Sequence, residues 1–65
     1  MIINFNKKIY SLKSIKKAIK DYSQLADFKL AQKKNYFLVT IEKIKPEFKN
    51  TFKDEFSNYI LSLHQ

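Results

Sequence analysis

Apolar residues in this 65-residue chain recur with a period of two in some segments and of about 3.6 in others. The period switches from two to 3.6 twice along the sequence. A period of two is typical of a strand with one buried face, and a period of 3.6 is typical of an amphipathic helix. A chain of this length forms one small domain. The pattern therefore predicts a single α+β domain that spans residues 1–65.

Three segments have the strand period, and they cover residues 2–6, 28–33 and 36–41. The third is the most β-prone run in the chain, because it consists of β-branched, aromatic and aliphatic residues. A short polar connection separates the second and third segments, which predicts a hairpin. Asn35 is the residue of this connection that tolerates a positive φ, so we expect it to form the turn.

Two segments have the helical period, and they cover residues 12–25 and 46–63. Ser11 is the predicted N-cap of the first helix, and Pro46 suits the first turn of the second. The apolar stripe of the second helix contains Phe48, Phe52, Phe56, Tyr59, Ile60 and Leu63. We expect Phe52 and Phe56 to be buried against a set of aliphatic side chains, namely Ile15, Ile19, Val39 and Ile41.

The third strand should be central in the sheet, because both of its faces are apolar. The second strand has the features of a protected edge, since Lys29 and Lys33 point outward. A right-handed crossover from strand one to strand two leaves room for strand three between them. The predicted fold is βαββα, with an antiparallel sheet of order 1-3-2 and two helices on one face.

The residues that carry most enzyme chemistry are missing or isolated. The chain has no Cys and no Gly, which excludes disulfides, thiolate metal sites and glycine-rich phosphate loops. Asp54 and Glu55 point about 100° apart on a helix, so they do not form a catalytic pair. His64 is the single histidine and is predicted to lie in a fraying tail. We expect a protein that is not an enzyme and has no cofactor and no metal.

The chain is strongly basic, with thirteen lysines, no arginine, six acidic residues and a net charge of +7. The helix over residues 12–25 exposes a lysine face, the candidate polyanion site, which contains Lys13, Lys16, Lys17 and Lys20. Such a face suits nucleic acid, but Lys lacks the planar fork with which Arg reads bases. A solvated helix face, or a genome biased toward lysine, explains the same pattern. Both interpretations remain open.

The helix-free face of the sheet is the other candidate surface. The candidate partner-binding residues on strands one and three are Ile2, Asn4, Tyr36 and Leu38. Strand one has no charged side chain at its edge, which favours pairing with an added peptide strand. Exposed apolar residues on this face, together with Leu61, also allow a homodimer.

Three segments resemble HxsD-like proteins of His-Xaa-Ser peptide systems, and they read FNKKIYSL (5–12), YFLV (36–39) and DEFSNYIL (54–61). Ile15, Ala18, Ile19 and Tyr22 extend the first match. The family occurs beside radical SAM enzymes that modify peptides. The resemblance implies a non-catalytic accessory or peptide-binding module, whose partner is a radical SAM maturase or its precursor peptide. A lysine-rich nucleic-acid-binding protein and a self-associating structural protein are the alternatives.

No segment approaches the ~20 apolar residues of a membrane span. The amino-terminal residues also lack the order of charged and apolar segments that a signal peptide has. We therefore expect a cytoplasmic protein without a membrane partner.

Overall fold

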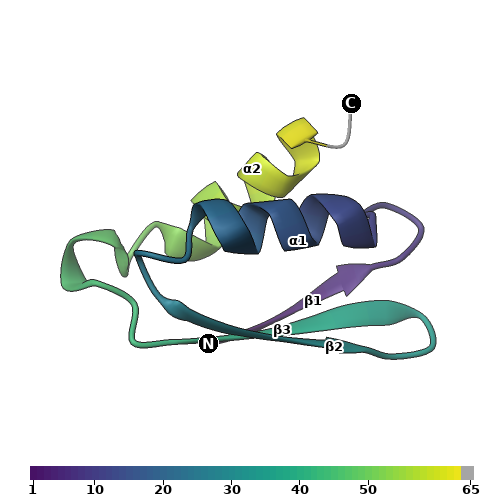
Figure 1. Ribbon diagram of the computed structural model, residues 1–65, viewed down its shortest axis with the longest axis horizontal. Helices are drawn as coiled ribbons and strands as arrows, with labels where there is room; N and C mark the ends of the chain where they lie inside the picture. Colours follow the sequence, from purple (N-terminus) through teal and green to yellow (C-terminus); the bar gives the residue numbers. More distant parts are fainter. Residues whose placement is uncertain (64–65) are drawn as a thin grey trace.

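The computed structural model describes residues 1–63, which form an antiparallel three-stranded sheet with both helices on one side (Figure 1). The elements are β1 (Ile2–Asn6), α1 (Leu12–Asp21), β2 (Asp27–Gln32), β3 (Tyr36–Glu42), a 3-10 turn η1 (Pro46–Phe48) and α2 (Phe52–Leu63). The strand order is β1-β3-β2, so the predicted fold class and sheet order are confirmed. Because β1 and β2 both pair antiparallel with β3, they run parallel to each other.

Strand β3 is central, and its two faces have different surroundings. Phe37, Val39 and Ile41 are buried beneath the helices. Tyr36 and Leu38 point to the other face and are half-buried. The inward side chains of β1 and β2 continue the buried layer on either side, so the helices cover a continuous apolar surface.

Helix α1 begins as predicted and ends earlier than predicted. Ser11 is its N-cap, and the Ser11 hydroxyl accepts a hydrogen bond from the Ser14 backbone N–H at 3.1 Å. The helix ends at Asp21 instead of residue 25, and the Leu25 N–H donates to the Tyr22 carbonyl in a turn. Ala26 is buried from this turn, so the apolar spacing continues although the helix has ended.

The predicted helix over residues 46–63 is wrong in its first part. Pro46 begins the short 3-10 turn η1, and α2 starts only at Phe52. The Thr51 carbonyl accepts the Glu55 N–H at 3.0 Å, which is the bond that opens the α-helical ladder. Asn50 and Thr51 have low helix propensities, which favours a break here. Phe48 still packs against the core from η1, so its spacing from Phe52 imitates a helix.

Asn35 lies in the β2–β3 connection as expected, but it does not adopt the positive φ that it tolerates. Within residues 1–63, the non-glycine residue with positive φ is Lys43, at 55°. The hairpin closes through the Lys33 N–H, which donates to the Tyr36 carbonyl at 2.9 Å. The Asn35 carbonyl accepts the Lys7 N–H at 3.1 Å, which ties the hairpin to the segment after β1. This contact to β1 constrains the turn in place of a left-handed residue.

Aromatic rings occupy the centre of the core. Phe52 and Phe56 are buried as predicted, together with Ile15, Val39 and Ile41, while Ile19 is half-buried. The Phe56 ring lies 5.2 Å from Phe28 and 5.3 Å from Tyr22, measured between ring centroids. Because Phe56 of α2 touches rings from β2 and from the C-cap of α1, it joins the helices to the sheet.

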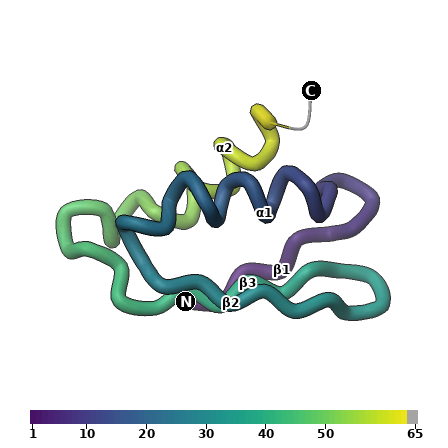
Figure 2. The backbone as a smooth tube through the Cα atoms, viewed as in Figure 1, coloured from purple at the N-terminus to yellow at the C-terminus, as the bar shows by residue number. Residues whose placement is uncertain are grey.

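The two helices run antiparallel across the sheet (Figure 2). The connection after β1 and the β2–β3 hairpin lie at one end of the molecule, and the long connection after β3 lies at the other. The last turn of α2 rises away from the sheet. Leu61, on this turn, is 40% exposed, in agreement with its position off the apolar stripe.

Candidate functional site

The four predicted partner-binding residues lie together on the helix-free side of the sheet, which we call the open sheet face. Asn4 is paired directly with Leu38, and Tyr36 is paired with Asn6 one step along. Ile2 is 63% exposed and lies opposite Thr40. Alternation along the strands places all of these side chains on the same surface. The register thus brings residues from two distant segments into one patch.

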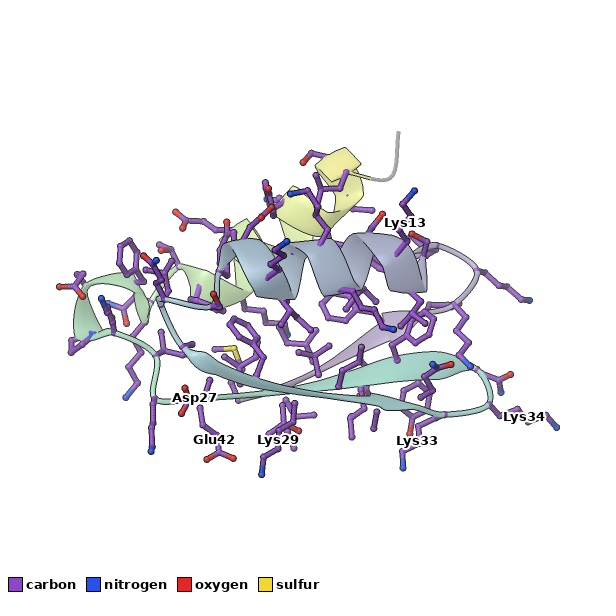
Figure 3. The ribbon with its side chains drawn as sticks, in the orientation of Figure 1. Lys13, Asp27, Lys29, Lys33, Lys34 and Glu42 are labelled. Atoms are coloured by element: carbon purple, nitrogen blue, oxygen red, sulfur yellow. The ribbon has the colours of Figure 1, made fainter. Side chains whose placement is uncertain are left out.

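Charge divides the open sheet face into distinct regions (Figure 3). Lys29 and Lys33 lie along its β2 side, and Asp27 and Glu42 lie at one end. The region over β1 and the middle of β3 has no charged side chain. A partner that contacts this region meets apolar and amide groups beside a margin of positive charge.

The hydrogen bonds of β1 show which of its backbone groups are free. Met1 donates from its amino terminus to the Ile41 carbonyl at 2.9 Å and accepts the Ile41 N–H at 2.8 Å. Lys7 donates to Asn35, so the odd-numbered residues of this segment face β3. Because pairing alternates in an antiparallel ladder, Ile2 and Asn4 direct their N–H and C=O groups away from the sheet. Within residues 1–63, these groups have no backbone partner.

The free edge of β1 is short because the following segment closes it. The Asn6 carbonyl accepts the N–H groups of Ile9 and Tyr10 at 3.0 and 2.9 Å. The Asn6 side-chain oxygen accepts the Lys8 N–H at 2.8 Å. An added strand therefore pairs with Ile2 and Asn4 and ends beside Asn6.

The free edge of β2 differs in both length and charge. Since the Lys33 N–H pairs with Tyr36, the alternate residues Phe28, Leu30 and Gln32 direct their backbone groups outward. The neighbouring Lys29 and Lys33 side chains lie along this edge on the open sheet face (Figure 3). Edge lysines discourage pairing between strands, as the sequence predicted for this strand.

The lysine face of α1 is exposed, but it is partly neutralised. The Lys17 ammonium forms an ion pair with Asp21 at 3.0 Å, and Asp21 also accepts a hydrogen bond from the Tyr59 hydroxyl. Beside it, a shallow groove of about 330 Å³ is lined by Ser11, Lys13, Ser14, Lys17 and Leu63. The four predicted polyanion-binding lysines thus lie on one helix, and one of them has an intramolecular partner.

The Asp21–Tyr59 contact shifts the ionisation of both groups. The hydrogen bond from Tyr59, followed by that from Lys17, lowers the pKa of Asp21. The same hydrogen bond stabilises the protonated phenol and raises the pKa of Tyr59. Burial, followed by the charge of Glu55, raises the pKa of Tyr22. These groups join α1 to α2 and lie away from the open sheet face.

The carboxylates considered for chemistry are not brought together in a cleft. Asp54 and Glu55 are both exposed on the first turn of α2. Across residues 1–63, no three His, Cys, Asp or Glu side chains are close enough to hold a metal ion. His64 lies outside the described residues. In this same part of the chain, neither helix has the length and apolar character needed to cross a membrane.

A second basic cluster was not identified from the sequence. Lys7, Lys8 and Lys34 line a hollow of about 330 Å³ together with Asn6 and Asn35. We call it the basic hollow. A signal for it was present, because lysine pairs follow both the first and the second strand. Parallel β1 and β2 bring these two pairs to the same end of the sheet.

Comparison of the chain with protein-family models, with curated proteins and with solved structures finds no match.

Proposed function

We propose that this protein is a non-catalytic module that binds an extended peptide as an added strand along β1. The observation that carries the proposal is the position of the unpaired backbone groups of Ile2 and Asn4 beside the uncharged region of the open sheet face. Strand addition uses such groups for affinity and uses alternate side chains for selectivity. Ile2 and Leu38 supply an apolar surface for the side chains of the added strand.

The short free edge sets the expected strength of binding. Two residues of β1 offer two N–H donors and two carbonyl acceptors, and a typical hydrogen bond contributes about 0.5–1.5 kcal/mol. The cost of immobilising the peptide offsets part of this gain. We therefore expect weak and reversible binding, which suits an accessory protein that passes a peptide to another protein.

The resemblance to HxsD-like proteins names a class of partner for this edge. Proteins of that kind occur beside radical SAM enzymes that modify peptides. The added strand would then come from the precursor peptide or from an extended segment of the maturase. Such a role needs no cofactor and no catalytic residue in this chain, and a cytoplasmic location fits it.

Two rival functions use other surfaces. A nucleic-acid-binding protein would use Lys13, Lys16 and Lys20 of α1, since Lys17 is paired with Asp21. A homodimer would cover Tyr36 and Leu38 on the open sheet face, or Leu61 at the end of α2. The β1 edge is favoured because it combines free backbone groups with an adjoining apolar surface.

The test uses a synthetic peptide of alternating valine and threonine, labelled with fluorescein, and two N-methylated versions of it. Methyl groups on one set of alternate nitrogens remove the N–H groups that would pair with β1. Methyl groups on the other set leave those N–H groups in place. We expect fluorescence anisotropy to show binding of the unmodified peptide and of one methylated version, and no binding of the other.

Backbone amide shifts then locate the site on the protein. We expect the largest changes at residues 2–6 and on the neighbouring β3. Equal binding of both methylated peptides would contradict strand addition. Changes confined to the lysine face of α1 would favour the nucleic-acid-like surface, and a concentration-dependent shift without peptide would favour the homodimer.

A further inference from the structure

The basic hollow lies where the free edge of β1 ends. Asn6 belongs to both features, because it is the last residue of β1 and it also lines the hollow. Successive residues of a strand rise by about 3.3 Å, so the hollow lies roughly 7 Å beyond Asn4. A peptide whose pairing with β1 ends beside Asn6 therefore has its next residues close to the hollow.

The segments that form the hollow are fixed in position. The Lys7 N–H donates to Asn35, and the Lys8 N–H donates to the Asn6 side chain, at 3.1 and 2.8 Å. The Lys7 ammonium also lies 5.1 Å from the centroid of the Phe37 ring, a favourable cation–π contact. The lysines thus project from an ordered frame, which lowers the cost of holding an anion among them.

No carboxylate of the described chain neutralises these lysines. The ion pairs in residues 1–63 are Lys17–Asp21 and Lys43–Asp27, and neither involves the hollow. The acidic residues stand at the end of α1, the start of β2, the end of β3, in η1 and in the first turn of α2: Asp21, Asp27, Glu42, Glu47, Asp54 and Glu55. Figure 3 shows Asp27 and Glu42 at the end of the sheet opposite Lys33 and Lys34. The positive charge of the three lysines in the hollow is therefore not neutralised by an ion pair.

A second copy of the chain does not fit this site. Antiparallel pairing of β1 with a second β1 would bring the hollow beside the other end of the second strand. That end has a hollow of its own, lined by Met1, Ile41, Glu42, Lys43, Ile44 and Lys49. Of its two lysines, Lys43 is ion-paired with Asp27, and Glu42 offsets the charge of Lys49, so this end supplies no negative cluster to the hollow. The occupant must carry the opposite charge.

We infer that the basic hollow is an anion subsite for the peptide bound at β1, and that the peptide carries a cluster of Asp or Glu side chains next to its strand-forming segment. This inference rests on the proposed function and adds the chemistry of the partner. A peptide is favoured over nucleic acid because the neighbouring β1 groups pair with a peptide backbone and not with phosphates. The hollow selects the acidic segment and sets the register in which the strand adds.

The experiment compares three fluorescein-labelled probes of alternating valine and threonine. One has glutamates at its amino end, one has them at its carboxyl end, and the third has glutamines in their place. Antiparallel addition to β1 places the amino end of the peptide at the hollow, and parallel addition places the carboxyl end there. We expect the better of the two glutamate probes to bind about tenfold more tightly than the glutamine probe at low salt.

Charge reversal on the protein provides the matched control. Lys8→Glu with Lys34→Glu removes the subsite, and both side chains are exposed, so the fold is retained. Lys45→Glu with Lys53→Glu makes the same change in net charge at the opposite end of the molecule, again at exposed residues. We expect the first pair of substitutions to weaken binding of the glutamate probe by about tenfold, and the second pair to weaken it by less than about threefold. The glutamine probe should respond little to either pair.

Several results would overturn the inference. If both double variants lose the same affinity for the glutamate probe, the effect is one of net charge and not of the hollow. If the glutamate and glutamine probes bind equally well, the hollow does not select acidic side chains. Tighter binding of an oligothymidine that the Lys8–Lys34 variant abolishes would assign the hollow to nucleic acid. If glutamate dependence persists with a probe methylated on every nitrogen, strand addition fails while the anion subsite remains. If methylation abolishes binding while the lysine variants change nothing, the subsite fails while strand addition remains.

Discussion

The two faces of β3 are similar in sequence and opposite in environment. Phe37, Val39 and Ile41 face the helices and are at most 6% exposed. Tyr36 and Leu38, which alternate with them, face away from the helices and are only half-buried. Both sets are apolar enough to form a core, so the covering layer, and not the strand, decides which set does so. The face that is left over becomes the surface available to a partner.

The largest expected effect tests the covered face. Phe56→Ala removes a ring that contacts β1, β2 and the C-cap residue of α1, and large-to-small changes of this kind cost about 3–5 kcal/mol. We expect urea denaturation to show loss of most of the stability of so small a domain. Leu61→Ala, on the same helix but exposed, is the control and should change the unfolding free energy by less than about 0.5 kcal/mol. Similar midpoints for the two variants would mean that α2 is not packed as described.

A smaller effect is expected on the open sheet face. Leu38→Ala removes a half-buried side chain and should cost about 1 kcal/mol, as typical substitutions do. The same variant should weaken binding of the alternating valine–threonine peptide directly, whereas Phe56→Ala should reduce binding only because it unfolds the protein. Urea denaturation and fluorescence anisotropy separate the two effects. A loss of stability as large as that of Phe56→Ala would show that another surface covers Leu38, and sedimentation would then identify a dimer.

The smallest expected effect concerns the contact between α1 and α2 on the solvent side of the two helices that cover the sheet. The pKa of Asp21 is lowered in the folded state, chiefly by the Tyr59 hydroxyl, so its contribution to stability is present above the unfolded pKa of about 4. This contribution is lost as pH falls through the lowered folded pKa. Tyr59→Phe should therefore flatten the acid limb of a plot of stability against pH. An unchanged acid limb in thermal melts would mean that Asp21 and Tyr59 are not coupled.

Local patterns were sufficient to predict most of the fold. Alternation identified all three strands, and Ser11 identified the start of α1 through its own side-chain hydrogen bond. The errors lie where an apolar residue reaches the core from a turn. Phe48 packs from η1, and Ala26 is buried just after α1 has ended, so both preserve a helical spacing without a helix. The spacing of apolar residues indicates which residues are buried, and it does not determine the backbone conformation at those residues.

The candidate surfaces were predictable to different degrees. The lysine face of α1 and the open sheet face each arise within single elements or paired strands, so periodicity was enough to identify them. The basic hollow combines Lys7 and Lys8 with Lys34, which is separated from them by a helix and a strand. Only the parallel arrangement of β1 and β2 on either side of β3 brings these residues together.

The sequence by itself determined the secondary structure of most segments, the central place of β3, the buried aromatic residues and the excess of positive charge. These properties depend on local periodicity and composition, which every window of the chain displays. The tertiary structure decided which face of β3 is covered, which backbone groups of β1 remain unpaired and where the charge gathers. Those properties depend on pairing and packing between residues far apart along the chain, and no local window contains that information.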